Sequence, residues 1–367
     1  MYEWSEEHQM IRDAVKRFVD EEVRPHVEDL EHGDLAPYGI LRKMFATFGM
    51  DAMARDRFAK QIDREKAVAE AQARGEEPPA AEESRGGDGG GLSLIPIIEL
   101  CRVCPGMVTA MGVSMGLTSA AIMSKGTTAQ KERWALDLLT MDKVGAWAIT
   151  EPGSGSDAFG SMKSTARRDG DDYILNGSKT FITNGPYADT TVFICKLDEG
   201  KPPAERKVLS FVLERGMPGF VQSKALRKMG MHSSPTGELF LDDVRVGRDR
   251  LIGETEDQSK GGRDGAKATF MQERSGVAAM ALGIIEECLQ LSVRYAKDRV
   301  QFGKPIGEFQ LIQDKLARME VARMNVQNLV FRVMEMGAAG HGMSLAEASA
   351  MKLYSARAAS EVAMEAV

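Results

Sequence analysis

The stretch best suited to chemistry is a turn of small residues that follows an apolar strand. Ala146 to Ile149 has strand character and leads through Thr150 into Glu-Pro-Gly-Ser-Gly-Ser-Asp, which ends at Asp157. Small residues let the main chain approach a ligand closely and expose N–H groups and hydroxyls. Such a turn can wrap the pyrophosphate and ring edge of a nucleotide cofactor. On turn chemistry alone, an ordinary β-barrel with Gly-rich turns explains the same residues.

A second informative segment lies downstream, from Ser178 to Gly185. Two Asn-Gly pairs, Asn176-Gly177 and Asn184-Gly185, flank a short strand from Lys179 to Thr183. Asn-Gly is typical of tight hairpin turns, because both residues accept a positive φ. We therefore predict a hairpin turn at each end of this strand.

Together the two segments resemble the flavin-binding strands of the acyl-CoA dehydrogenase family. The family pattern Thr-Glu-Pro-Gly-x-Gly-Ser-Asp is matched by Thr150 to Asp157, and Lys-x-Trp/Phe-Ile-Thr-Asn-Gly by Lys179 to Gly185. The resemblance covers most of the chain from Trp134 onward. It implies FAD as the cofactor, with contacts from Trp147, Ile149, Thr150, Gly155, Ser156, Phe181, Ile182 and Thr183.

A third segment, Asp298 to Gln310, resembles the family region whose Arg, Phe and Gln reach the FAD of a neighbouring subunit. The matching residues here are Arg299, Phe302 and Gln310. The resemblance implies a homo-oligomer, a dimer of dimers in relatives. Taken alone, Arg-x-x-Phe-Gly also fits a turn that ends a helix.

The family removes two hydrogens from the α and β carbons of an acyl-CoA thioester and passes the electrons to an electron-transfer flavoprotein. Loss of the α proton needs a carboxylate base in a dry pocket. The isovaleryl- and long-chain-type members place this base one residue before an Arg on the first helix of the C-terminal bundle. By resemblance the base is Glu273, and Arg274 shapes the site beside it. An exposed helical Glu is the alternative at this position, with the base in a C-terminal motif that this sequence lacks.

Substrate contacts are also implied by resemblance. Ser156 is one, and the helix that contains Gly112, Ser114 and Gly116 lies along the acyl chain in the family. Gly112 and Gly116 are one turn apart, so they can leave room for a long or branched chain. Close packing of a neighbouring helix against small residues explains the pair equally well.

Three other functions are compatible with parts of the pattern. An acyl-CoA oxidase differs only in whether O₂ reaches the reduced flavin, which sequence does not decide. A non-catalytic, structural subunit of a heteromeric dehydrogenase would keep the flavin motifs and lack the base. A DNA-associated flavoprotein of the same family would need a basic groove, and the net charge of −7 disfavours nucleic acid.

Helical, strand-like and again helical patterns follow one another along the chain. They predict an α+β fold like that of the acyl-CoA dehydrogenases: an N-terminal helical domain (1–143), a middle β-barrel (144–255) and a C-terminal helical bundle (256–367). The clearest strands are expected at 192–197, 208–214 and 238–246, and the bundle helices at 265–298, 308–336 and 344–367. Residues 62–91, rich in charge, Gly and Pro, predict a mobile insertion. Because no Gly, Pro or cap ends the last helix before Val367, we expect a truncated bundle.

Composition sets the remaining bounds. The 367 residues are 43% hydrophobic, which fits a globular protein of two or three domains. We expect no membrane span, since no run approaches the ~18 apolar residues required, and a cytoplasmic location. Four cysteines are too few for a disulfide framework, and Cys101 and Cys104 are read as core thiols with no metal site.

Overall fold

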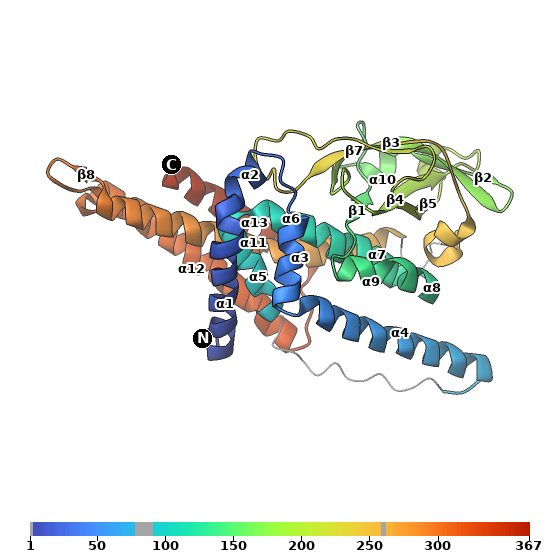
Figure 1. Cartoon of the computed structure of the whole chain (residues 1–367), viewed down its shortest axis with the longest axis horizontal. Helices are drawn as coiled ribbons and strands as arrows, with labels where there is room; N and C mark the ends of the chain where they lie inside the picture. Colours follow the sequence, from blue (N-terminus) through green and yellow to red (C-terminus); the bar gives the residue numbers. More distant parts are fainter. Residues whose placement is uncertain (1–2, 78–90, 258–261) are drawn as a thin grey trace. The chain divides into compact units, whose positions relative to one another are not determined.

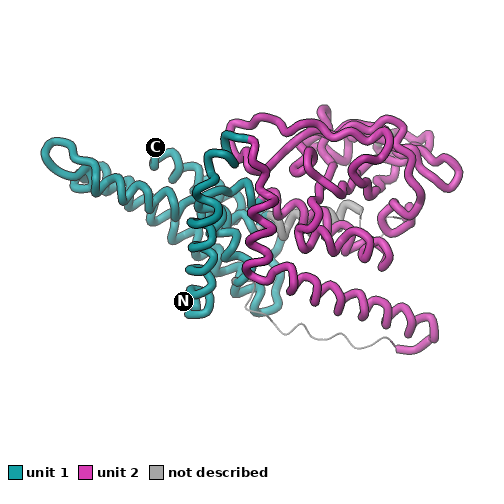
Figure 2. Tube along the Cα trace, viewed as in Figure 1, with its two compact units in different colours: residues 1–33, 83–108, 267–367 teal, residues 34–82, 109–266 magenta. Residues whose placement is uncertain are grey.

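The computed structural model describes residues 3–77, 91–257 and 262–367. The chain divides into two compact units, each assembled from segments distant in sequence (Figure 2). Unit 1 comprises Met1–Gly33, Glu83–Val108 and Lys267–Val367, and unit 2 comprises Asp34–Glu82 and Thr109–Ala266. Helices before and after a middle sheet agree with the predicted α+β fold (Figure 1).

Unit 1 is a bundle of helices with one small hairpin. Its elements are α1 (Glu6–Phe18), η1 (Val19–Val23), η2 (Arg24–His26), α2 (Val27–Glu31), α5 (Gly91–Val103), most of α11 (Gly262–Asp298), β8 (Val300–Gln301), β9 (Lys304–Pro305), η8 (Ile306–Glu308), α12 (Gln310–Ala338) and α13 (Leu345–Ala366). The three long bundle helices thus lie where the sequence predicts them. Their apolar faces meet in a core that includes Ile98, Leu282, Val330 and Met351.

The two cysteines of the Cys-x-x-Cys sequence are buried in this bundle. Cys101 belongs to α5, and burial raises the pKa of its thiol. Cys104 follows the helix, and its thiol donates a hydrogen bond to Glu31. A buried protonated thiol is an inert packing group, as expected for core cysteines.

Unit 2 is built on one seven-stranded sheet with the order β1-β4-β2-β3-β7-β6, in which β5 pairs with the other edge of β4. The strands are β1 (Gly145–Ala148), β2 (Thr165–Asp169), β3 (Asp172–Thr183), β4 (Thr190–Leu197), β5 (Val208–Glu214), β6 (Phe220–Gln222) and β7 (Thr236–Val246). β1 and β2 pair with β4 in parallel, whereas the other pairs are antiparallel. The three strands that the sequence marks most clearly are β4, β5 and β7.

Strand β4 is the centre of unit 2, because both of its faces are buried. Phe193 and Cys195 point into the interior of the sheet, where they meet Leu209 and Phe211 of β5. The alternate residues pack on the opposite face against Trp134 and the helices around it. A strand covered on both sides reads as a continuous apolar run, which explains why the sequence predicted β4 well.

Unit 2 also contains helices, and those around Trp134 cover one face of β4. The helices of unit 2 are α3 (Tyr38–Thr47), α4 (Met50–Arg74), the second half of α6 (Pro105–Gly112) continued by η3 (Val113–Thr118), α7 (Ser119–Lys125), α8 (Thr128–Gln130), η4 (Lys131–Ala135), α9 (Leu136–Leu139), α10 (Ala158–Ser161), and the short η5 (Pro203–Glu205), η6 (Arg248–Arg250) and η7 (Ile252–Glu254). The segments η3 and η4 are π-helical.

The prediction that a mobile insertion begins at residue 62 is wrong. Helix α4 continues to Arg74 and ends at Gly75, whose φ of +71° is the left-handed conformation common after a helix. Phe58 and Ile62, one turn apart, are buried against Trp134. The dense charges here are those of good helix formers on a solvated face, and the rest of the predicted insertion, 78–90, lies outside the described residues.

Two ion pairs also join the second half of α4 to η4. Glu65 pairs with Lys131 at 2.8 Å, and Lys66 pairs with Glu132 at 2.7 Å. Lys131 and Glu132 open the π-helical segment η4 that carries Trp134. The outer half of α4 is therefore part of the folded unit.

Two helical stretches, Pro105–Lys125 and Gly276–Asp298, are long and apolar enough to cross a bilayer by length and composition alone. This differs from the expectation that no run approaches a span. Half of the first apolar window and 39% of the second are buried inside the protein. Buried core helices pass the same test, so these stretches are weak evidence for a membrane span.

We predict that Ile62→Ala lowers the free energy of unfolding by about 2–4 kcal/mol, because it leaves a cavity beside Trp134. Urea unfolding followed by circular dichroism measures the change. Gln61→Ala, an exposed neighbour on the same helix, is the matched control and should change stability by less than about 0.5 kcal/mol. Equal stability of the two variants would show that Ile62 of α4 does not pack in the core of unit 2.

Candidate functional site

The turn after β1 is closed by its own main chain. Glu151 and Ser154 exchange two hydrogen bonds of 3.0 Å, so Pro152 and Gly153 form the tip. The Ser154 hydroxyl donates to the carbonyl of Asp157 and fixes the next step of the chain. The turn therefore has a defined shape before any ligand binds.

Gly155 and Ser156, which follow this turn, are exposed. Within the described part of the chain, their main-chain N–H groups donate no hydrogen bond. A Cβ atom added at Gly155 would meet nothing within 4 Å. Successive unpaired N–H groups beside a glycine form the type of cradle that holds phosphate groups, so these residues fit the pyrophosphate of FAD.

Strand β3 brings the second predicted segment alongside the first. The main-chain N–H of Thr180 donates to the carbonyl of Thr150 at 3.0 Å. The pairing of β3 with β7 shifts register between Lys179 and Ile182, which marks a bulge. At the bulge Phe181 has a φ of +55° and is 69% exposed. Bulges re-aim side chains, and this one turns an aromatic ring outward next to the Thr150 segment.

The predicted hairpin turn at Asn176-Gly177 is wrong. Both residues lie inside β3, at a second register shift between Leu175 and Gly177. Gly177 has a φ of +151°, and a Cβ there would come within 2.3 Å of Ser164. Asn-Gly thus serves here as a bulge at a close approach of two chain segments.

The second Asn-Gly pair forms a turn but not the predicted hairpin, because the strands on either side of it, β3 and β4, do not pair. Its Asn184 is buried and connects several segments. Its φ is +64°, and its side-chain amide donates to the carbonyls of Ala110 and Gly145, both at 2.8 Å. The Tyr38 hydroxyl donates to the Asn184 amide oxygen at 2.8 Å. One side chain thereby joins α3, α6 and β1 at the end of β3.

Beneath the two segments lies a buried ion pair. Lys179 has no exposed side-chain surface and Glu151 has 5%, and they are 2.9 Å apart. Lys179 also donates to the carbonyl of Ile149 at 3.0 Å. Glu151 accepts main-chain N–H groups from Lys163 at 2.6 Å and Ser164 at 2.9 Å. The pair therefore ties the end of β1 and the start of β2 to the bulge inside β3.

Burial alone would raise the pKa of Glu151, but the hydrogen bonds from Ser164, Lys179 and Lys163 outweigh it and hold that pKa below its ordinary value. Burial lowers the pKa of Lys179, against which Glu151 acts. Glu151 thus favours the charged form of the lysine.

The π-helix η3 packs on β1 and carries the two predicted substrate glycines at its edge and middle. Ser114 accepts the N–H of Gly145 at 2.9 Å, and a Cβ at Gly145 would come within 2.9 Å of Thr118. Gly112 and Gly116, in contrast, are exposed, and a Cβ at either would meet nothing within 4 Å. Among the described residues, the space beside both glycines is therefore open. A π-bulge frequently accompanies a functional site.

The other predicted residues of unit 2 have different surroundings. Trp147 and Ile149 are half-buried and pack on the helix-covered face of the sheet. Thr150 and Thr183 are half-buried. Ile182 is 2% exposed in the core of the sheet, so only its main chain can reach a ligand.

Five predicted residues belong to unit 1. Glu273 lies in α11, and its side chain is outside the described residues, whereas Arg274 is half-buried. The β8–β9 hairpin connects α11 to α12 (Figure 1). Arg299 follows α11, Phe302 lies in the turn between β8 and β9, and Gln310 begins α12; all three are exposed. Phe302 is 92% exposed with a φ of +51°, and Gly303 follows at +79°. This turn presents the aromatic ring to solvent.

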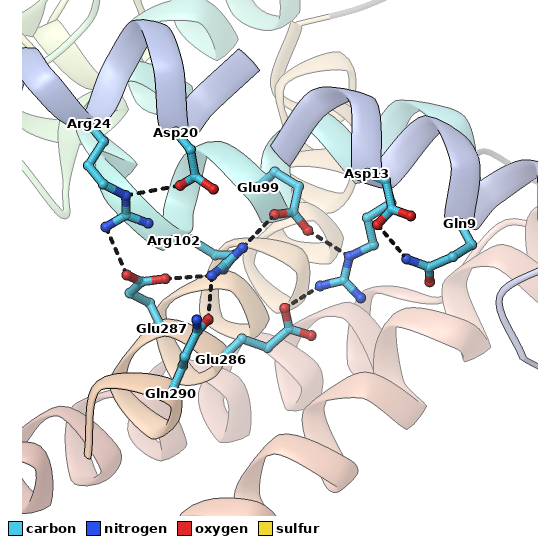
Figure 3. Close-up of polar contacts among 10 residues, drawn as sticks. Gln9, Asp13, Asp20, Arg24, Glu99, Arg102, Glu286, Glu287 and Gln290 are labelled. Atoms are coloured by element: carbon cyan, nitrogen blue, oxygen red, sulfur yellow. Dashed lines mark hydrogen bonds and ion pairs between the residues drawn. The ribbon is translucent and has the colours of Figure 1, made fainter. Parts of the chain in front are cut away.

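Unit 1 also contains a network of charged side chains (Figure 3). Several of them, among them Arg12, Glu99 and Arg102, line a cleft of about 640 Å³. Arg102, buried in α5, bonds Glu99 at 3.1 Å and Glu287 at 2.7 Å. Arg12 of α1 bonds Glu99 at 2.6 Å and also contacts Glu286. These bonds connect α1, α5 and α11, and we assign the network to holding the bundle together.

Comparison with known proteins identifies the family. Models of the acyl-CoA dehydrogenase N-terminal, middle and C-terminal domains match residues 5–56 and 50–142, 146–244 and 260–367. The chain belongs to the acyl-CoA dehydrogenase family, whose members are flavoprotein oxidoreductases.

Individual relatives agree with this assignment. The chain is 39% identical to the short-chain specific acyl-CoA dehydrogenase of Megasphaera elsdenii. This match covers 67% of the present chain and 63% of the relative, which is less than two thirds of that protein. It is 32% identical to an acyl-CoA dehydrogenase of Bacillus subtilis over 99% of its length and 87% of the relative. The solved butyryl-CoA dehydrogenase of Megasphaera elsdenii superposes with a TM-score of 0.80 at 30% identity, covering 100% of this chain and 88% of the other.

Sequence reasoning missed two groups that position this site, the Lys179–Glu151 pair and Asn184. A lysine between strand residues and a Glu at the start of a Gly-rich turn normally indicate solvated groups. One signal was present in the sequence: Glu151 and Lys179 each lie inside one of the two segments that resemble the flavin-binding strands.

We predict that Glu151→Gln lowers the free energy of unfolding at pH 7 by about 3–5 kcal/mol, because it leaves Lys179 buried without its counter-charge. Since the folded-state pKa of Glu151 lies below its unfolded value, its contribution is complete above about pH 5 and disappears as the pH falls through the folded pKa. Urea unfolding at pH 7, 5 and 3.5 should show the difference between wild type and variant shrinking at the lowest pH. A difference that is constant over this range would contradict an ionised Glu151.

Proposed function

We propose that this chain catalyses the FAD-dependent α,β-dehydrogenation of an acyl-CoA thioester to the trans-2-enoyl-CoA and delivers the electrons to an electron-transfer flavoprotein. The observation that carries the proposal is the exposed Gly155–Ser156 cradle, held beside the Phe181 bulge by a main-chain hydrogen bond within unit 2. When bound, FAD supplies the acceptor for the β hydrogen as hydride.

In this proposal each residue of the FAD site has a role. The N–H groups of Gly155 and Ser156 hold the pyrophosphate, and the Ser156 hydroxyl also faces the substrate. Thr150 and Thr183 offer hydroxyls to the edge of the flavin ring. Phe181 covers the ring and keeps water away from it.

We assign the α-proton base to Glu273, one residue before Arg274 on α11. A carboxylate can take this proton only where exclusion of water raises its pKa toward the working pH. The proposed substrate is a medium-to-long or branched acyl-CoA, supported by the open space at Gly112 and Gly116. Side chains at these positions would narrow that space.

Arg299, Phe302 and Gln310 are proposed to complete the FAD site of a second copy of the chain. Their exposure in the connection between α11 and α12 supports this role. The charged Arg299 and the aromatic Phe302, held outward at a tight turn, suit contact with another molecule. A monodisperse monomer that holds FAD at full occupancy would contradict it.

We predict that Glu273→Gln keeps FAD bound but slows bleaching of the flavin by acyl-CoA by about 10³-fold, since Gln retains size and hydrogen bonding without basicity. Stopped-flow absorbance under anaerobic conditions measures the rate. Glu335→Gln, an exposed Glu on α12, is the matched control and should reduce its flavin at the wild-type rate.

Bleaching of Glu273→Gln at close to the wild-type rate would place the base elsewhere. A purified wild-type protein that is colourless and takes up no FAD on reconstitution would reject the enzymatic proposal itself and favour a structural subunit.

A further inference from the structure

The buried Lys179–Glu151 pair stands directly beneath both segments of the proposed FAD site. Lys179 is the residue before the bulge at Thr180 and Phe181, and Glu151 opens the turn that leads to Gly155. The distance between the charges is 2.9 Å, and both side chains are more than nine-tenths buried. No part of either charge faces solvent enough to serve as a binding group for a dissolved ligand.

The contacts of the pair connect the end of β1, the start of β2 and the bulge inside β3. The Lys179 ammonium donates to the Ile149 carbonyl at 3.0 Å and to Glu151, and it lies 5.2 Å from the ring of Phe193. The Glu151 oxygens accept the N–H groups of the two residues that precede β2. Every polar contact is thus made to a chain segment that enters or leaves the site.

Stability alone does not account for a pair of this kind. A buried ion pair can often be replaced by well-packed apolar groups at no net loss of stability, because desolvation cancels much of the attraction. What apolar groups cannot supply is direction: hydrogen bonds to one particular carbonyl and two particular N–H groups. The strained φ of +55° at Phe181 also needs fixed points on both sides to persist.

We propose that Lys179 and Glu151 are positioning residues that set the register between the Gly155–Ser156 cradle and the Phe181 bulge, and thereby determine how tightly and in what environment FAD binds. The inference rests on the proposed function. In the variants below, loss of the ammonium lets the Thr150 segment and the bulge shift relative to one another, although the sheet still folds.

The test separates positioning from stability with one single and one double variant. Lys179→Met leaves an unpaired buried carboxylate, so both the thermal midpoint and the affinity for FAD should fall. Lys179→Met combined with Glu151→Gln removes the unpaired charge and should recover most of the thermal midpoint. Its affinity for FAD should still be at least about tenfold weaker than that of the wild type, a loss of about 1.4 kcal/mol. Its flavin absorption band should also be shifted.

Val246→Ala is the matched control. Val246 is buried in the same sheet and pairs with Tyr173, at the end of β3 that lies away from the bulge. The cavity should lower the thermal midpoint but change the affinity for FAD by less than about threefold. FAD binding is measured by fluorescence titration of the apoprotein, and unfolding by circular dichroism.

Two outcomes overturn the inference while leaving the proposed function in place. One is a double variant that regains wild-type FAD affinity and flavin spectrum together with its thermal midpoint. The other is a Val246→Ala protein that loses FAD affinity as much as the double variant. A wild-type protein that binds no FAD overturns the proposed function, and this inference with it.

Discussion

Lys179 carries its charge into the interior of unit 2, and the surrounding fold must satisfy that charge. A buried ammonium without a partner is very costly, so the turn after β1 and the residues before β2 have to bring a carboxylate and its hydrogen-bond donors to one place. The same bonds fix where β1 ends and where β3 bulges. Access to the Gly155–Ser156 cradle and the outward turn of Phe181 both follow from this arrangement.

Asn184 imposes a second constraint of the same type. Its amide satisfies two buried carbonyls and its oxygen accepts from Tyr38, so the end of β3 cannot move without leaving polar groups unpaired. Lys179 and Asn184 thus hold the bulge from both sides. A positive φ at an aromatic residue, which costs about 1–3 kcal/mol, persists because its flanks are fixed in this way.

The fold was largely predictable from the sequence, and the reasons are visible in particular elements. Strand β5 was predicted at its observed bounds because an apolar run with turn residues on both sides fits little else. Helix α4 was missed beyond residue 62, since its charges outweighed the helix propensity of the same residues and the packing of Ile62 was invisible in sequence.

The site was predictable only where a local motif carried the information. The residues from Thr150 to Asp157 predict their turn directly. Asn-Gly, in contrast, suits a hairpin turn and a bulge equally well, so the hairpin predicted at Asn176-Gly177 is a bulge in the structure. Burial of Lys179 could not be foreseen, because the bulge breaks the alternation along β3 and places Lys179 and Thr180 both inside. The roles of Glu273 and Arg299 remain proposals that rest on family resemblance.

In the proposed site the N–H groups of Gly155 and Ser156 are preformed donors for FAD, and amide hydrogen exchange tests this role most directly. Without FAD, these two amides should exchange rapidly, since they are exposed and donate to no group within the described part of the chain. On saturation with FAD, the account predicts marked protection at Gly155 and Ser156, with little change at the already bonded amide of Ser154. Tight binding of FAD with unchanged exchange at Gly155 and Ser156 would contradict it.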